Sequence, residues 1–218
     1  DLKARYNKML VITDLDQKNA VQDELRGLIK VGGIDVNIMT KLDRDNYGDD
    51  GELLPLGFSD ALSGLRGYAE SDLSSSIIFS AGFNRRLYAY CEQFDDFYPD
   101  EQGHIKKKIV LKVSDFRSSV IQGKFLAKKG LWVSEYRIES GLNCGGHAFA
   151  TEGLLMGPIL EEFRGKKHDL FLDLYKICNQ VLESKESRLF SMQPYAAITV
   201  QGGIGSFDED QFLQHYYD

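Results

Sequence analysis

The chain has 218 residues, and its 33 Asp and Glu outnumber its 26 Lys and Arg, so the formal net charge is −7. This negative balance offers no basic face to a phosphate backbone and no general attraction to anionic lipids, so we expect no nucleic acid and no membrane among the partners. Apolar residues make up 43% of the chain, whose length suits one globular domain, and no apolar run reaches the ~18 residues that span a bilayer.

Short apolar segments alternate with helical patterns along the whole chain. The apolar segments are rich in Ile, Val and aromatic residues and show little polar alternation, which predicts strands buried on both faces, as in a parallel sheet. The expected strands are Met9–Thr13, Ile34–Met39, Ile77–Ser80, Ile109–Val113, Leu131–Ile138 and Ala196–Val200.

Between these strands, apolar residues recur at the spacing of one helix face. The expected helices are the stripe 21–29 stopped by Gly32-Gly33, the segment 84–94, a helix capped by Ser114-Asp115 and ended by Gly130, the stripe 170–182, and a last helix that begins with a capping box at 206–209. One long irregular insertion, at about 41–76, contains an acidic, turn-rich part, Asp43–Glu52, and a short helix at Ser59–Glu70.

Strands that alternate with helices predict βαβ units and an α/β fold, for which two architectures remain. A doubly wound dinucleotide fold requires a glycine-rich turn after the first strand, and Thr13–Asp16 contains no glycine. The glycine-rich turns follow the fifth and sixth strands, where a barrel forms its phosphate site. We therefore predict a single domain over residues 1–218 of the (β/α)8 TIM-barrel type, incomplete, with about six βα units.

The first candidate site is the turn Gly141–His147, directly after the fifth strand. Glycines at the C-terminal end of a strand let backbone N–H groups approach a ligand closely, and an imidazole beside them can transfer a proton near pH 7. The alternative is a tight turn whose histidine caps a helix or lies in solvent.

Two further candidates follow neighbouring strands. Gln201–Gly205 offers free N–H groups and a helix N-terminus to a phosphate, although an ordinary glycine-rich connection has the same pattern. Lys112 lies inside an apolar strand, where a lysine needs an anionic partner or an exit to solvent. At the C-terminal end of a barrel strand it would face the ligand; alternatively it marks the solvent edge of the strand.

No metal site is expected. The segment 43–54 imitates the start of a calcium loop, but Tyr47 and Leu54 occupy positions that need oxygen ligands. Cys144 and His147 have metal-like spacing without a second Cys or His pair nearby.

In order and spacing, these pieces resemble the flavin-binding stretch of nitronate monooxygenases and the related FMN-dependent enoyl reductases. The pattern of that family is a strand ending in Lys, a helix, a strand, a Gly-x-x-(Cys or Ala)-Gly/Ala-Gly-His turn, a helix, and a strand ending in Gly-Gly. The matching segments are Leu111–Ser114, Gly141–His147 and Val200–Gly203. Members of the family are (β/α)8 barrels that bind FMN at the C-terminal mouth.

The resemblance implies an FMN-dependent oxidoreductase that acts on a small-molecule substrate. His147 would transfer a proton next to the flavin, taking it from an acidic C–H or nitro substrate, and Cys144 would shape the turn. Lys112 and Asn37 would contact the flavin itself, and glycine N–H groups would bind its phosphate. The implied cofactor-binding residues are Lys112, Asn37, Gly145, Gly146, Gly202 and Gly203.

Three alternatives stay open. An FMN-dependent enoyl reductase would use the same site to pass electrons from NAD(P)H to an activated alkene. A barrel with Cys144 as covalent nucleophile would use Gly145-Gly146 as oxyanion donors. A barrel without redox activity would bind a phosphorylated ligand at Gly202-Gly203.

Two expectations concern the protein as a whole. Six of the family's eight βα units have counterparts here, so we expect the chain to be part of a longer protein, and barrels of this kind often form homo-oligomers. The three cysteines, Cys91, Cys144 and Cys178, are an odd number at wide spacing, which predicts reduced thiols and a cytoplasmic location.

Overall fold

The computed structural model describes residues 1–29, 32–80, 82–139, 156–202 and 204–217. The chain forms two compact units, residues 1–33 and residues 34–218, and each is described by itself. The expectation of one domain over 1–218 stays a prediction.

The first unit contains two helices, α1 (Leu2–Leu10) and α2 (Leu15–Gly27). Asp14 caps α2 by accepting a hydrogen bond from the backbone N–H of Gln17 at 2.8 Å. The strand predicted at Met9–Thr13 is therefore wrong, because α1 runs through Met9 and the next helix is already capped at Asp14. A short apolar run is compatible with a helix end as well as with a strand, and here only the flanking caps distinguish the two.

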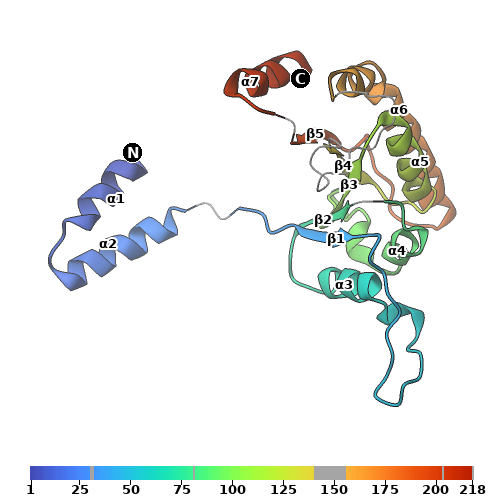
Figure 1. Ribbon diagram of the computed structural model, residues 1–218, viewed down its shortest axis with the longest axis horizontal. Coiled ribbons are helices and arrows are strands. Elements are labelled where there is room, and N and C mark those ends of the chain that lie inside the picture. The colour runs from blue at the N-terminus through green and yellow to red at the C-terminus, as the bar shows by residue number, and fades with distance from the viewer. Residues whose placement is uncertain (30–31, 81, 140–155, 203, 218) are drawn as a thin grey trace. The chain divides into compact units, whose positions relative to one another are not determined.

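The second unit is built on a parallel sheet of five strands in the order β1-β2-β3-β4-β5, which confirms the expected α/β class (Figure 1). Six strands were predicted along the chain. Among the described residues, five of the predicted segments form strands, and all five belong to this unit. The strands are β1 (Val36–Met39), β2 (Ser75–Ser80), β3 (Lys107–Val113), β4 (Val133–Glu139) and β5 (Ala197–Gln201). Each strand pairs in parallel with the next one in the sequence.

Helices and 3₁₀ turns connect these strands, and α7 follows the last strand. The α-helices are α3 (Asp60–Ala69), α4 (Arg85–Tyr90), α5 (Phe116–Ala127), α6 (Met156–Ser184) and α7 (Phe207–Tyr217), and the 3₁₀ turns are η1 (Leu56–Phe58), η2 (Cys91–Gln93) and η3 (Asp95–Phe97). Asn84 and Asp115 cap α4 and α5 with their side chains. The expected capping box of the last helix is confirmed, since Ser206 and Glu209 exchange hydrogen bonds.

The helices pack on one face of the sheet, which we call the core face. One continuous cluster joins buried side chains of α3 to α6 to alternate strand residues such as Ile77, Phe79 and Leu111, and α7 packs against the same cluster. Helix α3 contacts β1, and α5 contacts β3 and β4 (Figure 1). Ile78 and Val110 are buried as well but do not belong to this cluster. Because side chains alternate along a strand, these two residues lie on the opposite face.

The opposite face, which we call the polar face, is charged along β4. Glu135, Arg137 and Glu139 lie on it, whereas Tyr136 and Ile138 lie in the core. The expectation of strands buried on both faces is therefore wrong for β4, whose polar residues do alternate. Within the described parts of the chain, none of the helices combines the length and apolar character that a bilayer crossing demands.

The contact between α5 and β4 generates a stability prediction. A Cβ atom on Gly123 of α5 would lie 2.5 Å from the hydroxyl of the buried Tyr136 and 3.0 Å from Leu174. We expect Gly123→Ala to lower the free energy of unfolding by about 1–3 kcal/mol through overpacking, as measured by urea denaturation. Gly67→Ala is the matched control, because it lies in α3 with nothing within 4 Å of the added Cβ. This control should stabilise by about 0.5–1 kcal/mol, and equal effects would contradict the packing described.

Candidate functional site

The C-terminal ends of the parallel strands meet at one edge of the sheet, and two of the predicted residues lie there. Lys112 is the second-last residue of β3, and Gly202 directly follows the last residue of β5. Glu139, which ends β4, lies between them in the strand order. In α/β folds this edge is where ligands bind, since the loops that follow the strands gather there.

Lys112 forms an ion pair with Glu139 across two neighbouring strands. The Lys112 Nζ lies 2.8 Å from the Glu139 Oε1, and the two side chains are only 13% and 12% exposed. This partner explains how the sheet holds a lysine with little solvent around it. The sequence predicts that Lys112 needs an anionic partner or an exit to solvent, and the structure shows an anionic partner within the chain. That partner, Glu139, was not identified from the sequence.

A second ion pair lies on the same face, nearer the middle of the strands. The Arg137 Nε donates to the Glu135 Oε1 at 2.7 Å, and the Thr199 hydroxyl of β5 donates to the same oxygen at 2.5 Å. Their exposures, 24% for Arg137 and 19% for Glu135, are again low. The polar face of β3 to β5 is therefore held together by side-chain contacts between charged and polar groups.

A register shift puts these charges on one face. The pairing of β3 with β4 is irregular between Ile109 and Val110: Ile109 faces Val133, but Val110 faces Glu135. Ser134 is thus an extra residue of β4, and such a bulge changes the face to which all later side chains of the strand point. Without it, Glu135, Arg137 and Glu139 would point into the core. In the sequence, charged and apolar residues alternate strictly from 135 to 139, and this pattern indicates that the charged side chains share one face of the strand.

The helix N-terminus after β5 does not offer the free N–H groups that we expected for a phosphate. The carboxylate of Glu209 accepts hydrogen bonds from the backbone N–H groups of Gly205 and Ser206, at 2.7 and 3.0 Å. The first turn of α7 also carries Asp208 and Asp210. Three carboxylates at this position repel an anion. Gly202 remains a candidate, with a positive φ of 80° that favours glycine.

Asn37 is not brought together with Lys112. It lies on β1, exposed and on the polar face, and its register partner is Ile78 of β2. Lys112 belongs to β3, so about 10 Å of sheet separates the two strands. The other predicted site residues, Gly145, Gly146, His147 and Gly203, and with them Cys144, lie outside the described residues.

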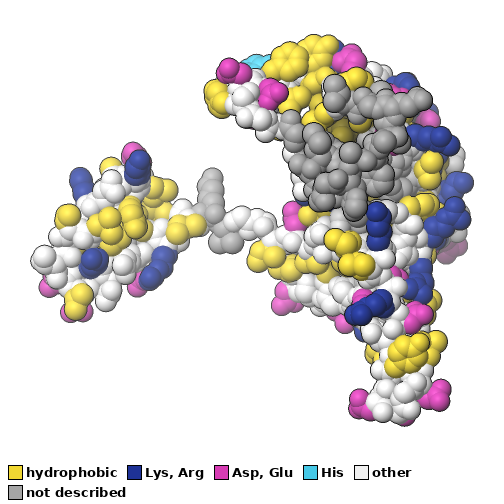
Figure 2. Space-filling model, viewed as in Figure 1, with side chains coloured by type: hydrophobic (Ala, Val, Ile, Leu, Met, Phe, Trp, Pro, Cys, Tyr) yellow, Lys and Arg dark blue, Asp and Glu magenta, His cyan; other side chains and the backbone are white. Residues whose placement is uncertain are grey.

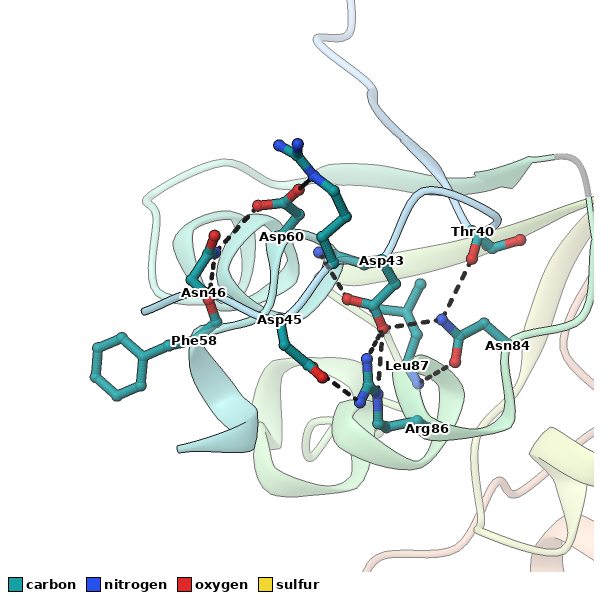
Figure 3. Close-up of polar contacts among 11 residues, drawn as sticks. Thr40, Asp43, Asp45, Asn46, Phe58, Asp60, Asn84, Arg86 and Leu87 are labelled. Atoms are coloured by element: carbon teal, nitrogen blue, oxygen red, sulfur yellow. Dashed lines mark hydrogen bonds and ion pairs between the residues drawn. The ribbon is translucent and has the colours of Figure 1, made fainter. Parts of the chain in front are cut away.

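A separate polar cluster, the Asp43 cluster, ties the insertion to the C-terminal ends of β1 and β2 (Figure 3). The Asp43 carboxylate accepts hydrogen bonds from the Arg86 side chain at 2.5 Å, from the Asn84 amide at 3.1 Å and from the backbone N–H of Ala61 at 3.2 Å. Burial raises the pKa of Asp43, but these hydrogen bonds outweigh burial and hold its pKa below the ordinary value.

One cavity, of about 570 Å³, opens on the polar face and is lined by Lys108, Val110 and Glu135, nearer the N-terminal ends of the strands than Lys112. A cavity of about 750 Å³ opens between α6, α7 and β5, but it is lined by Ile198 and Val200, which lie on the core side of β5. Hydrophobic side chains are also exposed on α7, at the top of Figure 2; they include Phe207 and Phe212. Among the residues that the structure describes, no group of three or more His, Cys, Asp or Glu could hold a metal ion.

Comparisons of this chain with protein-family models, with curated proteins and with solved structures found no match.

The Asp43 cluster generates a prediction about stability and pH. Asp43→Asn removes a 6% exposed carboxylate and leaves Arg86 without it, so we expect a loss of about 2–3 kcal/mol of unfolding free energy at neutral pH. Because the pKa of Asp43 is lower in the folded chain, its stabilisation is complete above the ordinary value of 3.8 and is lost as pH falls through the lowered value. The variant and the unchanged protein should converge in acid.

The control for this prediction is Asp45→Asn. Asp45 lies 3.5 Å from the same arginine but is 52% exposed. We expect this variant to stay within about 0.5 kcal/mol of the unchanged protein in chemical denaturation at every pH. If both variants lose the same stability, the Asp43 cluster does not anchor the insertion.

Proposed function

We propose that residues 34–218 form an arc of a (β/α)8 barrel. The strand order follows the sequence without reversal, whereas a doubly wound sheet reverses its order at a switch point. The core helices pack on a single face, as in the outer ring of a barrel, whereas doubly wound sheets carry helices on both faces. The polar face would then be the interior of the barrel.

We propose further that the chain is an FMN-dependent oxidoreductase of the nitronate monooxygenase-like class. The observation that carries this proposal is the position of Lys112: at the C-terminal end of β3, on the polar face, at the same edge as Gly202. The ammonium group suits the carbonyl edge of a flavin ring, since it carries three N–H donors and, among the described residues, forms an ion pair with Glu139. The phosphate would depend on Gly202 with Gly203, Gly145 and Gly146, because Glu209 occupies the start of α7.

In this proposal the residues of the chain bind, orient and move a proton. Lys112 would hold the ring edge, the glycine N–H groups would hold the phosphate, and His147 would take a proton from an acidic C–H or nitro substrate. Bound FMN would supply the electron acceptor, with O₂ or another compound reoxidising it.

Of the alternatives, the enoyl reductase has the same requirements and is separated from our proposal by its substrate alone. A barrel that only binds a phosphorylated ligand would meet the same three carboxylates in the first turn of α7 as the phosphate of FMN, and it is separated from our proposal by the absence of flavin absorption. The nucleophile hypothesis depends on Cys144, since Cys91 and Cys178 are buried. These two free thiols support the proposal of a reducing, cytoplasmic location.

The first test is cofactor binding. We expect the purified chain to show the visible absorption of oxidised flavin, or to bind added FMN with quenching of its fluorescence. Lys112→Ala should weaken FMN binding by about 10- to 100-fold, because a hydrogen bond from a charged donor is lost.

The matched control is Lys108→Ala. Lys108 lies on the same strand and face but about 13 Å toward the N-terminal end of β3. The Lys108→Ala variant should bind FMN with the same Kd as the unchanged protein. Failure of the unchanged protein to bind FMN would remove the oxidoreductase proposal, and equal losses in both variants would remove the role of Lys112.

The second test separates chemistry from binding. His147→Ala should lower kcat for a nitronate or other acidic substrate by about 10²-fold or more while the Kd for FMN stays within a factor of about two. Steady-state kinetics beside an FMN titration measure both. A variant with unchanged kcat would show that another group moves the proton.

A further inference from the structure

Glu139 is the one carboxylate that the described residues place beside Lys112. The two side chains come from adjacent strands, 2.8 Å apart, and both are almost enclosed. An enclosed ion pair is costly to desolvate, so its charges contribute strongly to the local electric field, and the removal of either leaves the other uncompensated. The net charge of the pair is zero.

The neighbouring pair differs in its connections. Glu135 receives hydrogen bonds from both Arg137 and Thr199, and all three lie nearer the middle of the strands than the C-terminal edge. The Lys112–Glu139 pair lies at that edge, one residue before the end of β3 and at the last residue of β4. The two pairs therefore share a face and a strand but only one lies where a ligand would bind.

We infer that Glu139 is a positioning residue that holds the Lys112 ammonium at the strand ends and cancels its charge. The inference rests on the proposed flavin site. The ion pair with Glu139 restrains the position of the Lys112 ammonium, whose N–H donors can then serve a neutral acceptor such as a ring carbonyl. With the charge cancelled, the site disfavours a full negative charge beside the ring. Glu139 thus sets both the orientation of the lysine and the selectivity of the site for a neutral group.

The test compares Glu139→Gln with Glu135→Gln in the full chain loaded with FMN. The probe is sulfite, which adds to oxidised flavin to give an anionic, bleached product, so its Kd reports the positive charge near the ring. Glu139→Gln leaves Lys112 uncompensated and should bind sulfite about tenfold more tightly or better. Glu135→Gln removes the same charge on the same strand and should stay within a factor of about two.

A second variant separates charge from position. Glu139→Asp keeps the charge but shortens the side chain by one methylene, so the ammonium moves. This variant should keep the sulfite Kd of the unchanged protein and weaken FMN binding several-fold, and it tests the inference even if Glu139→Gln does not fold.

The outcomes are distinguishable. If the unchanged protein binds no FMN, the proposed function fails and the inference with it. If FMN binds but Glu139→Gln and Glu135→Gln have equal sulfite Kd values, or if Glu139→Asp binds FMN as tightly as the unchanged protein, only the role of Glu139 is overturned.

Discussion

The structure depends on one constraint: helices cover the core face of the parallel sheet, so the polar face must satisfy its side chains in another way. On β3 to β5 it does so with contacts between strands, from Lys112 to Glu139 and from Thr199 to Glu135, and with the ion pair of Arg137 and Glu135 within β4. Removing one partner of such a pair costs more than the pair itself contributes, because the remaining charge is desolvated. On the core face the strand side chains are therefore apolar and pack against helices, whereas on the polar face of β3 to β5 charged and polar side chains pair with one another.

The strands that carry the sheet were predictable, because apolar β-branched runs of this length between helical stripes have few other uses. Five of the six predicted segments became strands, and the caps at Asp115 and Ser206 were found as expected. Met9–Thr13 failed because its apolar run is too short to exclude a helix end. A parallel sheet in sequential order also followed from the alternation of strands and helices.

The charges of the candidate site were not predictable to the same degree. Lys112 was identified as needing a partner, but Glu139 is 27 positions further along the chain and the face of β4 depends on the bulge at Ser134. A regular register from Ile109 onward would point Glu139 into the core, so pairing could be inferred only once the shift was known. The capping of α7 by Glu209 was visible as a capping box, yet its consequence for phosphate binding was overlooked.

The two ends of the C-terminal edge use their charges differently. At β1 and β2, the Asp43 carboxylate accepts hydrogen bonds from Arg86, from Asn84 and from the backbone N–H of Ala61. At β3 and β4, among the described residues, Lys112 forms an ion pair with the carboxylate of Glu139. Among the described residues, the polar groups at the ends of β1 and β2 therefore hold the insertion in place, whereas a ligand of the proposed site would meet Lys112 at the end of β3.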